Sequence, residues 1–229
     1  MKFLKSFALG LLLLPLTLAT LWRLPAALLS LESQGLIFIL AGALAYALFE
    51  ALFEKPMPAY VFGHELTHAL ASMAMGGKVH SFHVSAKGGS VALSKTNFFV
   101  ALAPYCVPIY TIFVLLIYWI LKRFYPFPHL ETLFLVGVGL TLAFHASLTL
   151  DSIHQEQPDL KNTGTFFSIV FILLVNAWFL AGLSKILFWN QFSSTNFAWE
   201  VLRSQADIWA WVGAKSVDGI KFVFSQIRS

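Results

Sequence analysis

The sequence predicts an α-helical polytopic membrane protein with about five to six membrane helices, a short membrane-associated β-hairpin and a C-terminal amphipathic helix. Hydrophobic residues make up 58% of the 229 residues, charged residues make up only 11%, and apolar runs of about span length recur along the chain. A helix of about 20 apolar residues is long enough to cross the hydrocarbon core of a bilayer. A soluble enzyme of this length would need far more charge on its surface.

Charge and cysteine content exclude two further classes. The net charge of +4 is small and scattered along the chain, whereas nucleic-acid binding needs a clustered basic face. Cys106 is the only cysteine, so neither an intrachain disulfide nor a thiolate zinc cage can form. We therefore expect the lipid bilayer and no nucleic acid as partners, and any metal must be held by His, Asp or Glu.

Five apolar runs are predicted as plain membrane spans. They cover residues 7–22, 35–53, 97–121, 133–150 and 164–189. The first run has the basic start of a signal peptide, at Lys2 and Lys5. However, no clear cleavage site follows it, and the chain stays largely apolar up to residue 29, which favours a retained span.

Two glycine pairs bound a segment with a different periodicity. After Gly76 and Gly77 the helical pattern gives way to alternating residues, and Gly88-Gly89 stands where a tight turn would join two strands. We expect a β-hairpin over 78–95.

The last 40 residues, 190–229, carry an amphipathic pattern. A helical wheel places Trp209, Val212 and Ile220 on one side, with Lys215 and Lys221 opposite. This pattern predicts a helix lying at the membrane interface. The expected organisation is thus a single membrane-embedded domain, 1–189, followed by an interfacial tail.

One apolar stretch, 59–75, carries the residues with chemistry. It contains His64, Glu65 and His68 in the pattern HExxH. Residues four apart on a helix are neighbours, so the two imidazoles can bind one zinc ion. Glu65 projects about 100° round the helix from His64, where it can act as general base on a water held by the metal.

The alternative is that these side chains only pair with their neighbours. A charged group at mid-membrane costs on the order of 2.5–3.5 kcal/mol, so ionisable residues in an apolar stretch are functional candidates by default. A hydrolytic zinc usually has three protein ligands, and the third must come from elsewhere in the chain. His80 and His83 belong to the predicted hairpin and are expected to be interfacial. The remaining candidates near the later spans are Glu131, His145, Asp151, His154, Glu156 and Asp159.

Several motifs together resemble the site-2 protease family of intramembrane zinc metallopeptidases. Residues 63–70 read GHELTHAL, residues 76–79 read GGKV before the predicted hairpin, and residues 101–104 read ALAP. The resemblance covers 59–110 well and 140–180 loosely. It implies that His64 and His68 are zinc ligands and that Glu65 is the catalytic base.

In that family a distant Asp at the edge of a later span completes the zinc site. The resemblance favours Asp159, because a proline and a helix start precede an apolar run there; Asp151, His145 and His154 remain alternatives. A plain helix N-cap is the other interpretation of Asp159. The chain departs from the family at residues 101–104, where Ala-Gly-Pro is usual, and at Asp159, which Leu160 follows in place of glycine. It also leaves no room for an inserted PDZ-type domain.

The resemblance implies a zinc-dependent intramembrane endopeptidase that cuts a membrane-protein substrate, in a bacterial-type cell (inner) membrane. One alternative is a non-catalytic membrane scaffold or metal-handling protein that keeps the metal site. Another is a zinc protease of the prenyl-protein-processing type, which completes its site with a Glu, here Glu131 or Glu156.

Overall fold

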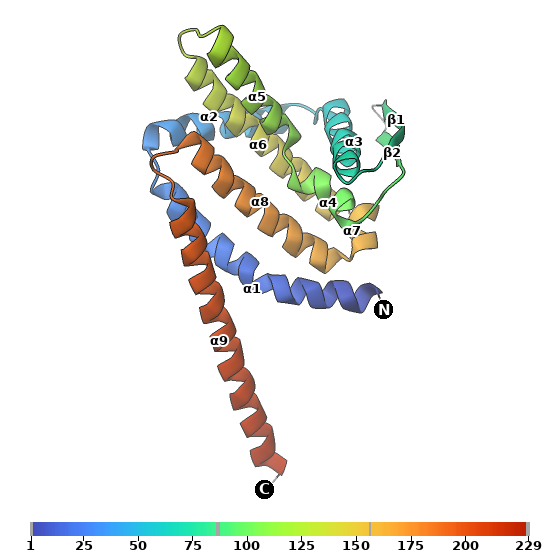
Figure 1. Ribbon diagram of the computed structural model, residues 1–229, viewed down its shortest axis with the longest axis vertical. Helices are drawn as coiled ribbons and strands as arrows, with labels where there is room; N and C mark the ends of the chain where they lie inside the picture. Colours follow the sequence, from blue (N-terminus) through green and yellow to red (C-terminus); the bar gives the residue numbers. More distant parts are fainter. Residues whose placement is uncertain (1, 86–87, 156, 228–229) are drawn as a thin grey trace. The chain divides into compact units, whose positions relative to one another are not determined.

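The structure is a computed structural model that describes residues 2–85, 88–155 and 157–227. Helices dominate these residues, and one two-stranded antiparallel sheet accompanies them (Figure 1). In chain order the elements are α1 (Lys2–Leu29), α2 (Ser33–Leu52), α3 (Met57–Ala74), β1 (Val79–Ser85), β2 (Gly88–Leu93), α4 (Phe98–Cys106), α5 (Ile109–Phe124), α6 (Leu130–His154), α7 (Pro158–Thr163), α8 (Thr165–Leu187) and α9 (Ser194–Ile227).

Four of the described helices are long and apolar enough to cross a membrane: α1, α2, α6 and α8. The pair α4 and α5 would make a fifth span if the two helices are counted together. These helices support the predicted class of multi-pass helical membrane protein. The helix that carries HExxH, α3, is not among them, so its depth in a bilayer stays a prediction, as does the kind of membrane.

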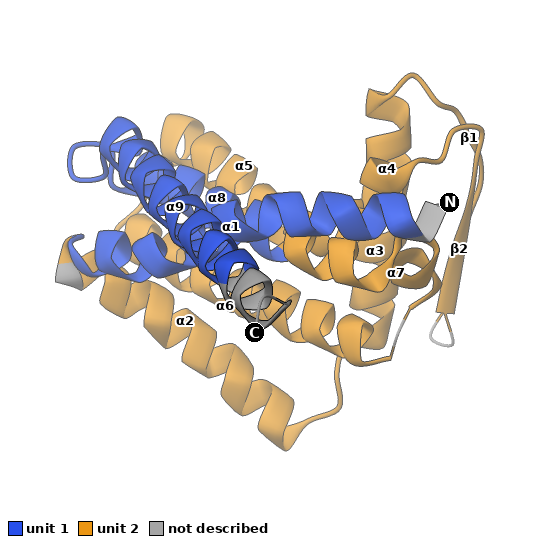
Figure 2. Cartoon of the chain, turned by 90° about the horizontal axis from the view of Figure 1, so that it is seen from below, with its two compact units in different colours: residues 1–31, 173–229 blue, residues 32–172 orange. Residues whose placement is uncertain are grey.

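The chain forms two compact units, residues 1–31 with 173–229, and residues 32–172 (Figure 2). In the first unit α1 packs against α9. Arg23 Nη1 lies 3.1 Å from Glu200 Oε2, and Arg23 Nε donates to Ser204 Oγ at 2.7 Å. The predicted C-terminal helix is present as α9, with Trp209, Val212 and Ile220 exposed on it. Its placement at a membrane interface stays a prediction.

In the second unit α2 and α6 pack with their backbones in close approach. A Cβ added to Gly42 would lie 1.9 Å from the carbonyl oxygen of Val136, and one added to Gly139 would lie 1.8 Å from that of Ile39. Helices in lipid pack tightly at small residues, because dispersion contacts replace the hydrophobic driving force. These two glycines therefore allow the backbones of α2 and α6 to lie in contact.

The apolar span predicted over 97–121 is broken in the structure: the chain bends by 64° between α4 and α5. Val107 at the break is extended, with φ −115° and ψ 104°, and Pro108 follows it. Proline has no N–H to donate and disfavours the helical conformation in the residue before it. The Val107-Pro108 pair thus ends α4 and lets α5 leave in another direction.

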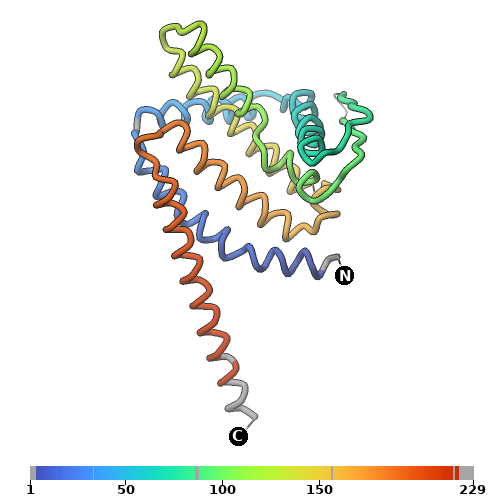
Figure 3. Tube along the Cα trace, viewed as in Figure 1, coloured from blue at the N-terminus to red at the C-terminus, as the bar shows by residue number. Residues whose placement is uncertain are grey.

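The predicted hairpin is present as β1 and β2, which lie beside α3 in the trace (Figure 3); residues 86–87 at its turn fall outside the described residues. Pairing shifts register between Val79 and Ser81, so the predicted alternation of side chains is interrupted there. Gly89 packs directly on α3. A Cβ on it would lie 2.5 Å from Val61 Cγ1 and 2.8 Å from Glu65 Cγ.

Candidate metal centre

His64 and His68 face the same side of α3, one turn apart. Their Nε2 atoms are 3.2 Å apart, and the two rings meet edge to face. Pro58 in the first turn favours the start of this helix, since its missing N–H would have no helical partner there. Gly76, with φ +73°, follows its end. The spacing of the HExxH motif therefore produces the neighbouring imidazoles that it predicts.

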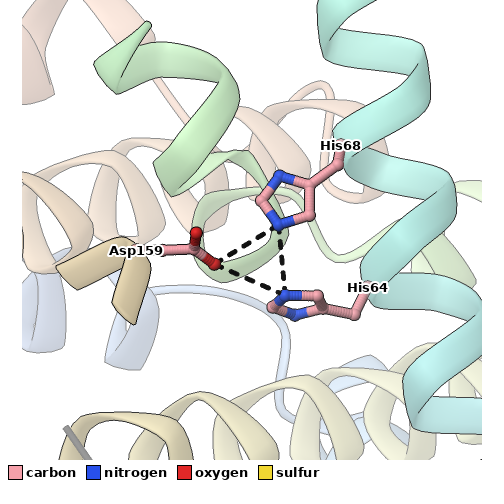
Figure 4. A group of neighbouring side chains, drawn as sticks. All are labelled: His64, His68 and Asp159. Carbon is pink, nitrogen blue, oxygen red and sulfur yellow. Dashed lines mark hydrogen bonds and ion pairs between the residues drawn. The ribbon is translucent and has the colours of Figure 1, made fainter. Parts of the chain in front are cut away.

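Asp159, from the short helix α7, completes a group of three side chains that could hold a metal ion (Figure 4). Its Oδ2 atom lies 3.4 Å from His68 Nε2 and 3.7 Å from His64 Nε2. The candidate ligand atoms all lie within 4.8 Å of one another. All three side chains are shielded, and Asp159 is the most accessible of them.

The spacing of these three atoms fits a small tetrahedral cation. Bonds of about 2.1 Å hold the ligand atoms of a tetrahedral zinc about 3.4 Å apart. The observed separations of 3.2, 3.4 and 3.7 Å lie on both sides of that value. Two of them are longer than an ordinary hydrogen bond, which spans about 2.7–3.2 Å. Two imidazole nitrogens and one carboxylate oxygen are also a usual donor set for zinc.

The tautomer of His68 leaves its Nε2 atom available as a ligand. Its Nδ1 atom lies 2.8 Å from the carbonyl oxygen of Val100 on α4. A carbonyl only accepts, so Nδ1 carries the hydrogen and Nε2 keeps its lone pair toward Asp159. Metal-binding histidines are commonly oriented by such a bond from the other ring nitrogen.

Two tyrosines enclose His64. The Tyr60 ring lies 5.5 Å away and the Tyr105 ring 5.4 Å away, centroid to centroid. The Tyr105 hydroxyl also donates to Asp159 Oδ2 at 3.2 Å, and the Tyr60 hydroxyl is hydrogen-bonded to Ser152 Oγ at 2.6 Å. Sequence reasoning missed both tyrosines, because no motif marks a contact that exists only after folding.

Glu65 lies beside the three candidate ligands without joining them. Its side chain is buried, in contact with the hairpin at Gly89, and within electrostatic range of both imidazoles and of Asp159. Burial raises the pKa of Asp159, but its interactions with the neighbouring His64 and His68 outweigh burial and hold that pKa well below its ordinary value. The group thus pairs an ionised carboxylate with two imidazoles and keeps a second carboxyl group alongside.

His64 also lines a small cavity of about 30 Å³. It lies at the break between α4 and α5, and Tyr60, Tyr105 and His145 are among its lining residues. A volume of this size is enough for a single water molecule. The cavity therefore has room for one water molecule beside His64.

Asp151, an alternative third ligand, points to a different partner. Lys55 Nζ forms an ion pair with it and lies 2.8 Å from Glu50 Oε1. Ser147 Oγ donates to the same Glu50 oxygen at 2.7 Å. Burial lowers the pKa of Lys55, but hydrogen bonds to Asp151 and Glu50 outweigh it and raise that pKa above its ordinary value. Asp151 thus ties the loop after α2 to α6.

The other histidine candidates also lie outside the group of three. His145 lines the cavity, and His154 Nδ1 donates to the Leu150 carbonyl of its own helix at 2.9 Å. His80 and His83 are exposed on β1. None of these four imidazoles therefore belongs to the group formed by His64, His68 and Asp159.

Of the two acidic candidates of the prenyl-protein-processing alternative, the structure describes Glu131, and Glu131 is not in the group. Glu131 lies in the first turn of α6, at the opposite end of that helix from Asp151. Glu156 lies outside the described residues. Among the described residues, Asp159 is the acidic side chain that meets the two imidazoles.

Comparisons with known proteins add no family to these observations. No family model matches the chain, and neither a curated protein nor a solved structure matches it.

Proposed function

We propose that this chain is a zinc-dependent intramembrane endopeptidase that cuts membrane proteins in or near their transmembrane segments. The observation that carries the proposal is the convergence of His64, His68 and Asp159 at separations suited to a tetrahedral zinc, with Glu65 buried beside them. The apolar helices of the chain, which are long enough to cross a membrane, support a substrate that lies in the membrane.

Each side chain has a distinct task in this proposal. His64, His68 and Asp159 hold the metal; a bound zinc supplies a Lewis acid that polarises a peptide carbonyl and lowers the pKa of a neighbouring water. Glu65 accepts a proton from the attacking water and delivers it to the nitrogen of the leaving amine. Its position next to the imidazoles, but outside the ligand group, supports this role.

The hairpin is the proposed site of substrate binding. A transmembrane helix hides its peptide groups in its own hydrogen bonds, so it must unwind before a carbonyl can be attacked. An extended segment can replace those bonds by adding to the edge of a strand. The contact of Gly89 with Glu65 supports this, because it holds a strand next to the proposed base.

A substitution at Glu65 tests the activity directly. Glu65→Gln keeps the size of the side chain and removes its ability to take up a proton at neutral pH. Membrane proteomes of cells expressing wild type and Glu65→Gln at equal levels are compared by quantitative mass spectrometry. We expect intact substrate to accumulate with the variant and its fragments to disappear. If no membrane protein differs between the two, the chain is a non-catalytic scaffold or metal-handling protein.

A further inference from the structure

One short helix, α4, contacts all three candidate ligands. The Val100 carbonyl accepts a hydrogen bond from His68 Nδ1 at 2.8 Å. One turn later the Tyr105 ring packs edge-on against His64, and its hydroxyl donates to Asp159 Oδ2 at 3.2 Å. Val100 and Tyr105 of α4 therefore contact ligand side chains that come from two other elements, α3 and α7.

The Val100 carbonyl is free for His68 because of a proline. In an α-helix the carbonyl of residue i accepts the N–H of residue i+4. The residue four after Val100 is Pro104, which has no N–H. Val100 is only 1% exposed, so its carbonyl has little access to water and needs another donor. The His68 imidazole supplies that donor.

Tyr105 is equally suited to hold Asp159. The residue is 1% exposed, and a buried phenol normally needs a hydrogen-bond partner. Its hydroxyl donates to the same carboxylate oxygen that faces both imidazoles. The bond thus fixes which oxygen of Asp159 points at the metal position and stabilises the carboxylate in its ionised form.

Hydrogen bonds fix the start of α4, and a proline break sets its end. The Asn97 side chain caps its start by accepting the Val100 N–H at 2.9 Å. Just before that cap, Ser72 on α3 donates to the Lys95 carbonyl at 2.9 Å. The far end stops at the break before Pro108. A short helix held in this way can keep a set of ligands in one geometry.

We propose that α4 positions all three metal ligands, with Pro104 and Tyr105 as positioning residues. Pro104 acts through the carbonyl it leaves free, and Tyr105 acts through its ring and its hydroxyl. The inference rests on the proposed zinc site and adds residues that the HExxH pattern does not contain. Loss of either residue weakens metal binding without removing a ligand.

The test measures zinc affinity of the full-length protein in detergent by competition with a chelator. Tyr105→Phe keeps the ring and removes the hydroxyl, and it should weaken zinc binding about 10- to 100-fold. Pro104→Ala restores an N–H that competes for the Val100 carbonyl, and it should weaken binding about 10-fold.

Matched controls separate positioning from general damage. Tyr118→Phe removes a hydroxyl that accepts a hydrogen bond from Lys122 Nζ within α5, and Pro25→Ala removes a proline inside α1. Both should bind zinc as wild type does. Two further readouts are thermal unfolding of the metal-free protein and visible absorption of the cobalt-loaded protein. The unfolding temperature of metal-free Tyr105→Phe should fall only by the loss of one hydrogen bond, whereas the cobalt absorption should change because it reports coordination geometry.

The outcomes distinguish this inference from the proposed function. If wild type binds zinc and Tyr105→Phe binds it equally tightly, the positioning role of Tyr105 is overturned and the metal site stands. Unchanged affinity in Pro104→Ala overturns the role of the freed carbonyl. If a variant loses zinc affinity only to the extent that its metal-free form loses stability, the residue has a structural role and the proposed positioning role is overturned. If wild type binds no zinc, the proposed function fails as well.

Discussion

The Nε2 atoms of His64 and His68 lie 3.2 Å apart, and both face the same oxygen of Asp159. Three side chains at such separations in a shielded site would repel or strain one another unless protons or a cation lay between them. A cation satisfies all three at once, whereas hydrogen bonds fit the two longer separations poorly. This relationship is the basis of the metal site and of the predictions that follow.

Asp159 and Asp151 should behave differently when each is replaced by alanine. Asp159→Ala removes a ligand, so zinc affinity should fall by more than the roughly 10- to 100-fold expected for loss of an outer hydrogen-bond partner. Asp151→Ala should keep zinc and lose about 1 kcal/mol of stability, because Lys55 loses one of the two anionic partners that it has among the described residues. Metal analysis and thermal unfolding of both variants check this, and equal zinc loss would refute the assignment of the third ligand.

Glu65→Gln should separate binding from catalysis. The variant keeps every candidate ligand, so its zinc content should equal that of wild type. Cleavage of a substrate identified by the proteomic comparison should fall about 10²- to 10⁴-fold, the usual contribution of a general acid–base group. Glu200→Gln, which alters a carboxylate paired with Arg23 in the other unit, should cleave normally. Near-normal cleavage by Glu65→Gln would mean that another group takes up the proton.

The contact between the hairpin and α3 should be sensitive to one methyl group. In Gly89→Ala the new Cβ would lie 2.5 Å from Val61 Cγ1 and 2.8 Å from Glu65 Cγ, so the strand must move. We expect a loss of about 1–3 kcal/mol of stability, as for overpacked sites, together with slower cleavage and unchanged zinc affinity. In the control Gly182→Ala the new Cβ would meet no described atom within 4 Å. Cleavage by Gly89→Ala at the wild-type rate would exclude this contact from the function.

Deprotonation of Lys55 at alkaline pH should make the folded protein less stable. Its pKa is raised above the ordinary value of 10.5 when the protein is folded. The stability that charged Lys55 contributes is therefore fully present below about pH 10.5. It is lost as the pH rises through the higher pKa that Lys55 has in the folded protein. The unfolding temperature of wild type should fall more between pH 9 and about 11.5 than that of Lys55→Met. Parallel curves for the two proteins would show that the ion pairs with Glu50 and Asp151 contribute nothing.

The sequence predicts those parts of this structure that depend on local spacing. Residues four apart on a helix must be neighbours, so the pairing of His64 and His68 follows from the motif alone. The apolar runs likewise predict α1, α2, α6 and α8, because span length and composition are local properties. The break at Pro108 was also open to prediction, since the proline stands inside the apolar run.

Contacts between distant segments could not be derived in this way. Asp159 was favoured by resemblance and not by any spacing, since its approach to His68 depends on how α7 is placed against α3 and α4. Asp151 remained an alternative from the sequence, and in the structure Lys55 engages it instead. The contacts of Tyr105 with His64 and Asp159 carry no sequence signal, because they arise from packing of three separate elements.

X-ray absorption spectroscopy at the zinc edge tests the central claim most directly. The full-length protein, purified in detergent and loaded with one equivalent of zinc, should show a four-coordinate ion with nitrogen and oxygen neighbours near 2.0–2.1 Å. The signal of two imidazoles should be present in wild type and in a His80→Ala/His83→Ala control, and lost in His64→Ala/His68→Ala. A sulfur neighbour, or an imidazole signal that survives replacement of His64 and His68, would contradict the account.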